Sequence, residues 1–180
     1  LYGARSIKPV GRTRRTSSAC GAPRLRDEDQ MNSEAIARMI YGAAIKLDAE
    51  DFKGFMRQCG DDFRYSIRSY SPELGQEMVW LEHDRKGMQD LFAMLPKHVR
   101  MTGRFKRHVS VYSVDRDDDR HARAHSSVLL VHTDMEGNSK LFAAGQYEDL
   151  IDTAGDTPRI LERVVRLETR NLGPGVHVPV

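Results

Sequence analysis

Four strand-like runs of unusual length follow one another in the second half of the chain, and they constrain the fold most. Residues 104–114, 121–133, 140–152 and 159–170 form runs of 11 to 13 residues, separated by short polar turns. A typical strand has about 5–6 residues. Because twist accumulates along long strands and bulges bend them, we expect a strongly curved, mostly antiparallel sheet. Such a sheet needs other elements to fill its concave face.

The first half of the chain supplies these elements as three predicted helices, each with a capping residue and one apolar face. The first begins after Ser33. Its apolar residues recur at three- and four-residue spacing and are Ile36, Met39, Ile40, Ala43 and Leu47. Asp48 is expected to cap the second helix, residues 49–59, which Gly60 ends. Asp84 is expected to cap the third helix, which stops before Pro96.

Two shorter strands complete the predicted fold. Residues 63–68 alternate between apolar and polar side chains, and residues 77–82 surround the single tryptophan. The order is therefore helix, helix, strand, strand, helix and four long strands. Because strands and helices do not alternate regularly, we predict an α+β domain rather than a doubly wound nucleotide-binding fold.

Residues 1–30 differ in composition from the rest of the chain. They carry seven Lys or Arg and three Asp or Glu, whereas the remainder carries 21 basic and 23 acidic side chains. They show no apolar period, so we expect a disordered or non-native extension, with Met31 as the start of one domain over residues 31–180. The basic charge belongs to this extension, which argues against nucleic-acid binding by the domain. We also expect no membrane partner, because no apolar run is long enough to span a bilayer.

The candidate metal ligands lack the spacing that a metal site needs. His121 and His125 lie in a predicted strand, where residues four apart on one face are roughly 13 Å from each other. The aspartates at residues 115–119 resemble the start of a calcium loop, but Arg120 replaces its required glycine, so a solvated turn is expected. The two cysteines form neither a disulfide framework nor a ligand pair, which favours a reducing, cytoplasmic location.

Three segments carry a family resemblance. Residues 41–56, followed by Asp-Asp-Phe-Arg-Tyr at 61–65, resemble a helix pair that leads into a strand. Residues 107–110 read Arg-His-Val-Ser, residues 144–149 read Ala-Gly-Gln-Tyr-Glu-Asp, and residues 159–167 supply Arg-Ile and Val-Val-Arg-Leu. Together these segments resemble the small (β) subunits of Rieske-type ring-hydroxylating oxygenases.

The resemblance implies a cone-shaped, nuclear-transport-factor-2-like α+β fold, with three N-terminal helices packed on a strongly curved, mostly antiparallel sheet. It also implies that the large (α) subunit carries the Rieske [2Fe–2S] cluster and the mononuclear iron. The small subunit is then expected to hold no cofactor, no metal and no catalytic residue. Its partners would be the large subunit and copies of itself in an α3β3 complex, with a reductase or ferredoxin as an indirect partner. The complex would hydroxylate an aromatic or a short sulfonated compound.

A stand-alone isomerase or dehydratase acting on a small molecule is the alternative function. Such an enzyme needs a desolvated carboxylate or histidine as base and a tyrosine or acid as proton donor. The residues of these types that could line the cone are Tyr65, His83, Asp84, His108 and Tyr112. Asp84 has a competing role as a helix cap. A third option is a protein-interaction module without any oxygenase partner.

The residues after Asn171 are apolar and rich in Pro and Gly, and they are too few for a core element of their own. We expect this segment to lie across the surface of a neighbouring subunit. On that interpretation, deletion of residues 172–180 weakens assembly more than it lowers the stability of the subunit.

Overall fold

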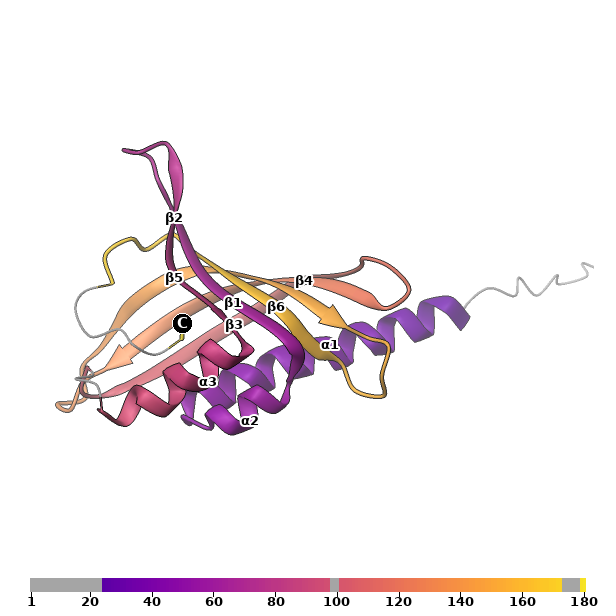
Figure 1. Cartoon of the computed structure of the whole chain (residues 1–180), viewed down its shortest axis with the longest axis horizontal. Helices are drawn as coiled ribbons and strands as arrows, with labels where there is room; N and C mark the ends of the chain where they lie inside the picture. The colour runs from indigo at the N-terminus through magenta and orange to yellow at the C-terminus, as the bar shows by residue number, and fades with distance from the viewer. Residues whose placement is uncertain (1–23, 98–100, 173–178) are drawn as a thin grey trace, which may run out of the picture.

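The computed structural model describes residues 24–97, 101–172 and 179–180, which form three α-helices and one six-stranded mixed sheet (Figure 1). The helices are α1 (Arg24–Asp48), α2 (Phe52–Arg57) and α3 (Arg85–Met94), and a short 3-10 helix (Leu95–Lys97) follows α3. The strands are β1 (Cys59–Ser71), β2 (Gln76–Asp84), β3 (Arg104–Arg116), β4 (His121–Thr133), β5 (Ser139–Asp152) and β6 (Arg159–Leu167). The α+β class predicted from the sequence is confirmed.

The sheet has the strand order β2-β1-β6-β5-β4-β3. Strands β1 and β6 run parallel to each other, and every other neighbouring pair is antiparallel. The pairing of β4 with β5 is the longest and runs from His121 opposite Asp152 to Thr133 opposite Ser139. The mostly antiparallel sheet is therefore confirmed, with one parallel pair, β1 and β6, next to the edge strand β2.

The long strands are confirmed, but their predicted strong curvature is wrong. Strands β1, β3 and β4 each contain 13 residues, and β5 contains 14. Within the described ranges the sheet stays open, with β2 and β3 as its edges. Each pairing contains one register irregularity. Isolated bulges of this kind increase twist and bend a strand locally, but they do not curl a whole sheet.

All three helices lie on one face of the sheet, and the hairpin of β1 and β2 projects away from them (Figure 1). Helix α1 packs against β3, α2 against α1 and β1, and α3 against β1 and β2. The buried core between the layers includes Ile36, Ile40, Phe55, Phe63, Met88, Val128, Tyr147 and Val165. Within the described ranges, no helix has the length and hydrophobicity of a membrane-spanning segment.

Helix α1 starts at Arg24 and contains 25 residues. The backbone of residues 24–30, which the composition assigned to an N-terminal extension, is therefore helical, while residues 1–23 lie outside the described ranges. The predicted apolar face of α1 is confirmed. Its members Ile36, Met39, Ile40, Ala43 and Leu47 are all buried.

The cap of the second helix differs from the prediction. Asp51, not Asp48, is the N-cap of α2, and its Oδ1 accepts a hydrogen bond from the Gly54 N–H at 2.8 Å. Helix α1 continues to Asp48, and Glu50 then adopts a φ of 54°, which turns the chain before α2. The predicted stop, Gly60, belongs to β1 because α2 ends at Arg57. Asp48 does not cap α2, and its carboxylate instead contacts Arg107 on β3.

The cap of the third helix is as predicted. Asp84 is the N-cap of α3, and its Oδ1 accepts a hydrogen bond from the Gly87 N–H at 2.7 Å. The α-helix ends at Met94, and Pro96 lies in the 3-10 helix that follows. This agrees with the helix-ending role of a proline.

Candidate functional site

A row of polar side chains crosses the inner face of the sheet. Arg163 on β6 lies between Tyr65 on β1 and Asp149 on β5, and it is the register partner of both. Because successive residues of a strand point to opposite faces, Tyr147 lies on the same side of β5 as Asp149. All four side chains are buried. We refer to Tyr65, Tyr147, Asp149 and Arg163, together with Arg107, as the interior polar cluster.

Arg163 and Asp149 form a two-point ion pair in this cluster. Arg163 Nε and Nη2 each donate to one oxygen of Asp149 at 2.7 Å, and both side chains have 0% exposure. Burial lowers the pKa of Arg163, but the charge and hydrogen bonds of Asp149 outweigh that effect and leave the pKa raised. The guanidinium carbon also lies 4.3 Å from the centroid of the Tyr147 ring, a cation–π contact. The two side chains are therefore held in one defined geometry.

Arg107 joins three parts of the chain. Its Nη1 donates to Asp48 Oδ1 at 2.8 Å, and its backbone N–H donates to the same carboxylate at 3.1 Å. Its Nη2 donates to the backbone carbonyl of Pro179. Strand β3 is thereby fixed both to the end of α1 and to the C-terminal residues.

The C-terminal residues 179–180 lie inside the fold rather than on a neighbouring surface. Val180 has 0% exposure and belongs to the hydrophobic core, and the Tyr65 hydroxyl donates to its carbonyl oxygen at 3.0 Å. Leu172 is also buried. The expectation that the segment after Asn171 lies across another subunit is therefore wrong for these residues, and residues 173–178 lie outside the described ranges. The carbonyl oxygens of Pro179 and Val180 instead accept hydrogen bonds from Arg107 and Tyr65. The Val180 side chain belongs to the hydrophobic core.

The residues predicted for acid–base catalysis do not converge on one pocket. Tyr65 points inward to Val180, and burial, with the neighbouring Tyr147, raises its pKa and keeps the hydroxyl protonated. His83 is the register partner of Tyr65, and both border an open hollow of about 480 Å³ with Asp84. The Asp84 carboxylate, however, is engaged as the cap of α3.

The other two members of the predicted set, His108 and Tyr112, face solvent from β3. His108 follows the buried Arg107 and is exposed, as strand alternation requires. Tyr112 lies at the register irregularity between Val111 and Ser113 and is 64% exposed. They therefore lie outside the interior where the set was expected to meet.

Sequence reasoning did not identify the interior polar cluster, although a signal for it was present. On β5, Tyr147, Asp149 and Ile151 share one face, and a carboxylate on an apolar face requires a buried partner. Arg163 directly precedes Val164 and Val165 in the next strand and could have been named as that partner. The contacts of Arg107 with α1 and the C-terminal residues had no comparable signal, because they join segments far apart in the sequence.

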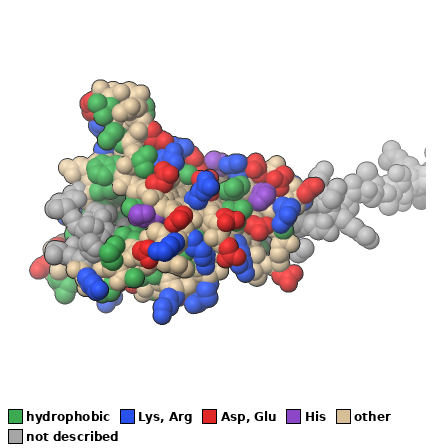
Figure 2. Space-filling model, in the orientation of Figure 1, with side chains coloured by type: hydrophobic (Ala, Val, Ile, Leu, Met, Phe, Trp, Pro, Cys, Tyr) green, Lys and Arg blue, Asp and Glu red, His purple; other side chains and the backbone are tan. Residues whose placement is uncertain are grey.

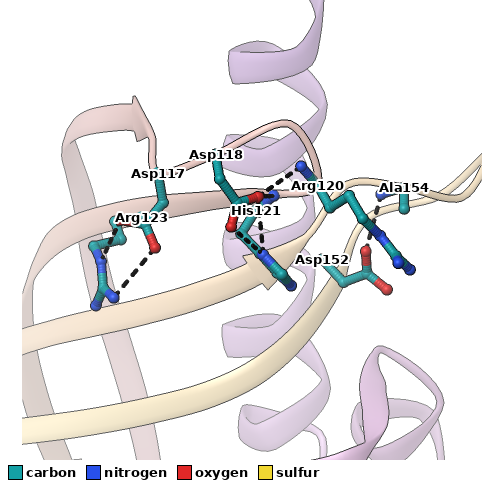
Figure 3. Close-up of polar contacts among 7 residues, drawn as sticks. All are labelled: Asp117, Asp118, Arg120, His121, Arg123, Asp152 and Ala154. Carbon is teal, nitrogen blue, oxygen red and sulfur yellow. Dashed lines mark hydrogen bonds and ion pairs between the residues drawn. The ribbon is translucent and has the colours of Figure 1, made fainter.

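The Asp-rich turn between β3 and β4 contacts the side chains of Arg123 and His121 on β4 (Figure 3). Asp117 accepts a hydrogen bond from Arg123 Nε at 3.0 Å, and Asp118 lies 2.8 Å from His121 Nδ1. The contact with His121 and the backbone N–H of Arg120 lower the pKa of Asp118. The two carboxylates are thus directed to different partners, as in a solvated turn. Among the described residues, no group of three or more His, Cys, Asp or Glu side chains could hold a metal ion.

The hairpin of β1 and β2 carries a group of exposed apolar side chains, visible at the projecting end of the molecule (Figure 2). This hairpin patch consists of Tyr70, Leu74, Met78, Val79 and Trp80, whose exposure ranges from 39% to 61%. No residue of β2 is fully buried, and its partly buried Leu81 packs against the core, so the outer strand contributes little to it. A two-stranded ribbon is marginally stable in water, and large exposed apolar patches are typical of interaction sites.

Ion pairs fix the orientation of the hairpin. Glu77 on β2 pairs with Arg68 on β1 at 3.2 Å and also with Arg166 on β6. Arg166 in turn pairs with Glu148 on β5 at 2.6 Å. The network links the hairpin to the centre of the sheet, so that the patch is presented in a defined direction.

The chain is similar to known β subunits in sequence and in fold. A family model described as "Ring hydroxylating beta subunit" matches residues 43–173. The chain is 33% identical to the β subunit of 2-aminobenzenesulfonate 2,3-dioxygenase from an Alcaligenes species, over 83% of this chain and 100% of that protein. It is 32% identical to the β subunit of the methanesulfonate monooxygenase hydroxylase from Methylosulfonomonas methylovora, over 82% of this chain and 87% of that protein.

Among solved structures, one described as the β subunit of an aromatic-ring-hydroxylating dioxygenase from Novosphingobium aromaticivorans superimposes with a TM-score of 0.75. The superposition covers 85% of this chain and 99% of that one, at 17% sequence identity. At this identity the similarity concerns the fold alone.

Proposed function

The chain belongs to the family of ring-hydroxylating β subunits, and from this premise we propose that it is the non-catalytic small subunit of a multicomponent oxygenase. Its role is to support the assembly and the geometry of the catalytic large subunit. The family resemblance stated from three sequence segments is confirmed by the family model and by the two β-subunit relatives.

The hairpin patch is the observation that carries this proposal. It combines exposed apolar side chains with an orientation fixed by the ion pairs of Glu77, and both of these features suit a permanent protein contact. The occupant we propose is the large subunit, because the two similar curated proteins are themselves named as subunits. The complete assembly is proposed to be α3β3, in which heterologous contacts close a ring.

The placement of the polar residues agrees with a non-catalytic role for this subunit. The candidate base His83 borders an open hollow, while Tyr65 and Asp84 are engaged in contacts within the fold. A stand-alone isomerase would need these groups to converge on one substrate. As the family resemblance implies, we place the Rieske cluster and the mononuclear iron in the large subunit, to which a reductase or ferredoxin would deliver electrons.

The substrate is proposed to be a sulfonated compound. One relative is named for 2-aminobenzenesulfonate and the other for methanesulfonate, so an aromatic and a short alkyl sulfonate both fit. The choice between them rests with the large subunit, where the proposed catalytic iron lies.

Co-expression with the Rieske-type large subunit encoded nearest to this chain tests the proposal. The expected result is a stable complex with the mass of α3β3 that contains all of the iron and hydroxylates a sulfonate. A chain that stays monomeric by light scattering, both alone and beside the large subunit, would contradict the proposal and favour the isomerase.

A further inference from the structure

The two edges of the sheet differ in how their backbone groups are occupied. Edge strand β3 lies against α1, and side chains of α1 bind its backbone. The Arg107 N–H donates to Asp48 Oδ1 at 3.1 Å, and the Val111 N–H donates to the Tyr41 hydroxyl at 3.4 Å. The edge of β3 is therefore covered in part by the chain itself.

The outer edge of β2 borders no other strand within the described ranges. Residues 76–79 pair in continuous register with residues 68–71 of β1, and the bulge comes after them, at Trp80. In an antiparallel pair, alternate residues direct both N–H and C=O toward the partner strand, and the residues between them direct both groups away. Residues 76–79 therefore present a regular backbone edge to a further strand.

The sequence of β2 lacks the residues that usually protect an edge strand. Lysine and proline are typical of protected edges, and β2 contains no Lys, Arg or Pro. Met78 and Val79 are adjacent and are 39% and 52% exposed, so apolar side chains lie on both faces of the strand. The end of the hairpin also projects away from the helices (Figure 1). This combination is typical of a strand that is covered on both faces and paired on both sides.

From the proposed function, on which this inference rests, we propose that β2 accepts an extended segment of the large subunit as a seventh strand of the sheet. Hydrogen bonds to the backbone of residues 76–79 supply the affinity, and Met78 and Val79 select a segment with apolar side chains on both faces. The segment contains no proline at the paired positions, because proline lacks the N–H that pairing requires.

The charges of β2 favour an uncharged segment. Glu77 already pairs with Arg68 and with Arg166, and Glu82 lies 3.6 Å from Arg68. These carboxylates have cations from β1 and β6 of the same sheet. A basic segment is therefore not required to neutralise them, and the contact is made by backbone groups and apolar side chains.

A second copy of this chain fits the edge less well than the large subunit does. Pairing of β2 with β2 is a two-fold contact, whereas the proposed α3β3 ring is closed by heterologous contacts. The other sheet edge of a copy is β3, whose N–H groups at Arg107 and Val111 already bind α1. The occupant we assign is therefore the large subunit.

The test uses the full chain in complex with the large subunit. The backbone N–H of Glu77 or of Met78 is replaced by an ester oxygen, which removes one hydrogen-bond donor and keeps the side chain. Because the two residues are adjacent in the regular segment, one N–H faces β1 and the other faces outward. Hydrogen exchange in the isolated native subunit identifies the outward N–H as the faster one, and the two variants are matched controls for each other.

The outward ester is expected to leave the melting temperature of the isolated subunit unchanged and to weaken binding to the large subunit about tenfold, the equivalent of one hydrogen bond. The inward ester is expected to lower the melting temperature. A native complex that the outward ester does not weaken would overturn the strand pairing and leave the proposed function standing. Failure of the native chain to form any complex would contradict both. Self-association of the isolated subunit that the outward ester abolishes would assign the edge to a second copy and overturn the proposal.

If neither ester variant folds, hydrogen exchange of the native chain supplies a second measurement. The outward N–H of the two is expected to exchange at least tenfold more slowly in the complex than in the isolated subunit. An unchanged rate in a complex that has formed would equally overturn the strand pairing.

Discussion

The hairpin patch and the C-terminal residues 179–180 are both apolar, yet the patch is exposed and the C-terminal residues are buried. The patch lies on the paired strands β1 and β2 and on the turn that joins them, and its side chains remain exposed. Residues 179–180 lie outside any helix or strand and are buried. Regular secondary structure and burial are therefore separate properties in this chain. An apolar segment is buried in its own subunit only when that subunit also supplies partners for its backbone.

The polar surroundings explain the difference. Tyr65 and Arg107 bind the two C-terminal carbonyls, so those carbonyls leave water without losing hydrogen bonds. The backbone of β2 is paired on one side only, because β2 is an edge strand. In the part of the chain that the structure describes, Met78, Val79 and Trp80 of β2 remain exposed, and in our proposal they contact the large subunit.

The largest expected effect comes from the buried ion pair. Asp149→Ala leaves the Arg163 guanidinium buried without its partner and is expected to lower the free energy of unfolding by about 3–5 kcal/mol. Urea denaturation measures the change. Asp117→Ala is the matched control, because it breaks a similar but exposed Asp–Arg pair with Arg123. The control is expected to change stability by less than about 1 kcal/mol, and equal losses in the two variants would contradict the account.

The next effect tests the comparison itself. Val180→Ala removes two buried methyl groups and is expected to lower the free energy of unfolding by about 2 kcal/mol. Trp80→Ala in the hairpin patch is expected to change it by less than about 0.5 kcal/mol, because the side chain is half exposed in the subunit. The reverse order of the two losses would show that the C-terminal residues are dispensable for the fold and that the hairpin is part of its core.

The stability of the fold at alkaline pH tests the burial of Cys59. Burial raises the pKa of the Cys59 thiol from 9.0 to about 12. Above pH 9 the unfolded chain loses this proton while the folded chain keeps it. The stabilisation is therefore complete below pH 9 and is lost as pH rises towards 12. Between pH 9 and 10, Cys59→Ala is expected to reduce the fall in unfolding free energy by about 1 kcal/mol. If the free energy of unfolding fell equally steeply with pH in the variant and the native chain, the burial of the thiol would be contradicted.

The smallest effect is expected from the ion pairs that orient the hairpin. Glu77→Gln removes the contacts with Arg68 and Arg166, which are partly exposed. The expected loss of stability is less than about 1 kcal/mol and decreases in high salt, because exposed ion pairs are screened. Thermal melts at two ionic strengths measure it. A loss of several kcal/mol would mean that the hairpin is part of the cooperative core.

Local features of the sequence predicted local structure well. The apolar spacing of α1, the cap of α3 at Asp84 and the long strands were all expected and are present. The cap of α2 was misplaced by three residues, because Asp48 and Asp51 both precede an apolar segment. Which carboxylate caps the helix depends on the contact between Asp48 and Arg107, and this contact joins residues 59 positions apart.

The site was predicted less well, because its parts come together only in the tertiary structure. Tyr65 was identified as an interior residue, but its partner Val180 lies 115 positions away in the sequence. His108 was assigned to the interior, whereas the alternation of β3 places its neighbour Arg107 there. A strand pattern specifies two faces, and it does not say which of them is the inner face when both carry charged residues.

The most direct test of the account compares a hairpin variant with the native chain in assembly. Trp80→Asp places a charge in the hairpin patch, outside the core, and is co-expressed with the large subunit. Size-exclusion chromatography with light scattering then reports the mass of the complex, and a thermal melt of the isolated subunit reports its fold. We predict that the variant melts like the native chain but no longer forms the complex. A variant that assembles as well as the native chain would contradict the assignment of the hairpin patch to the large subunit.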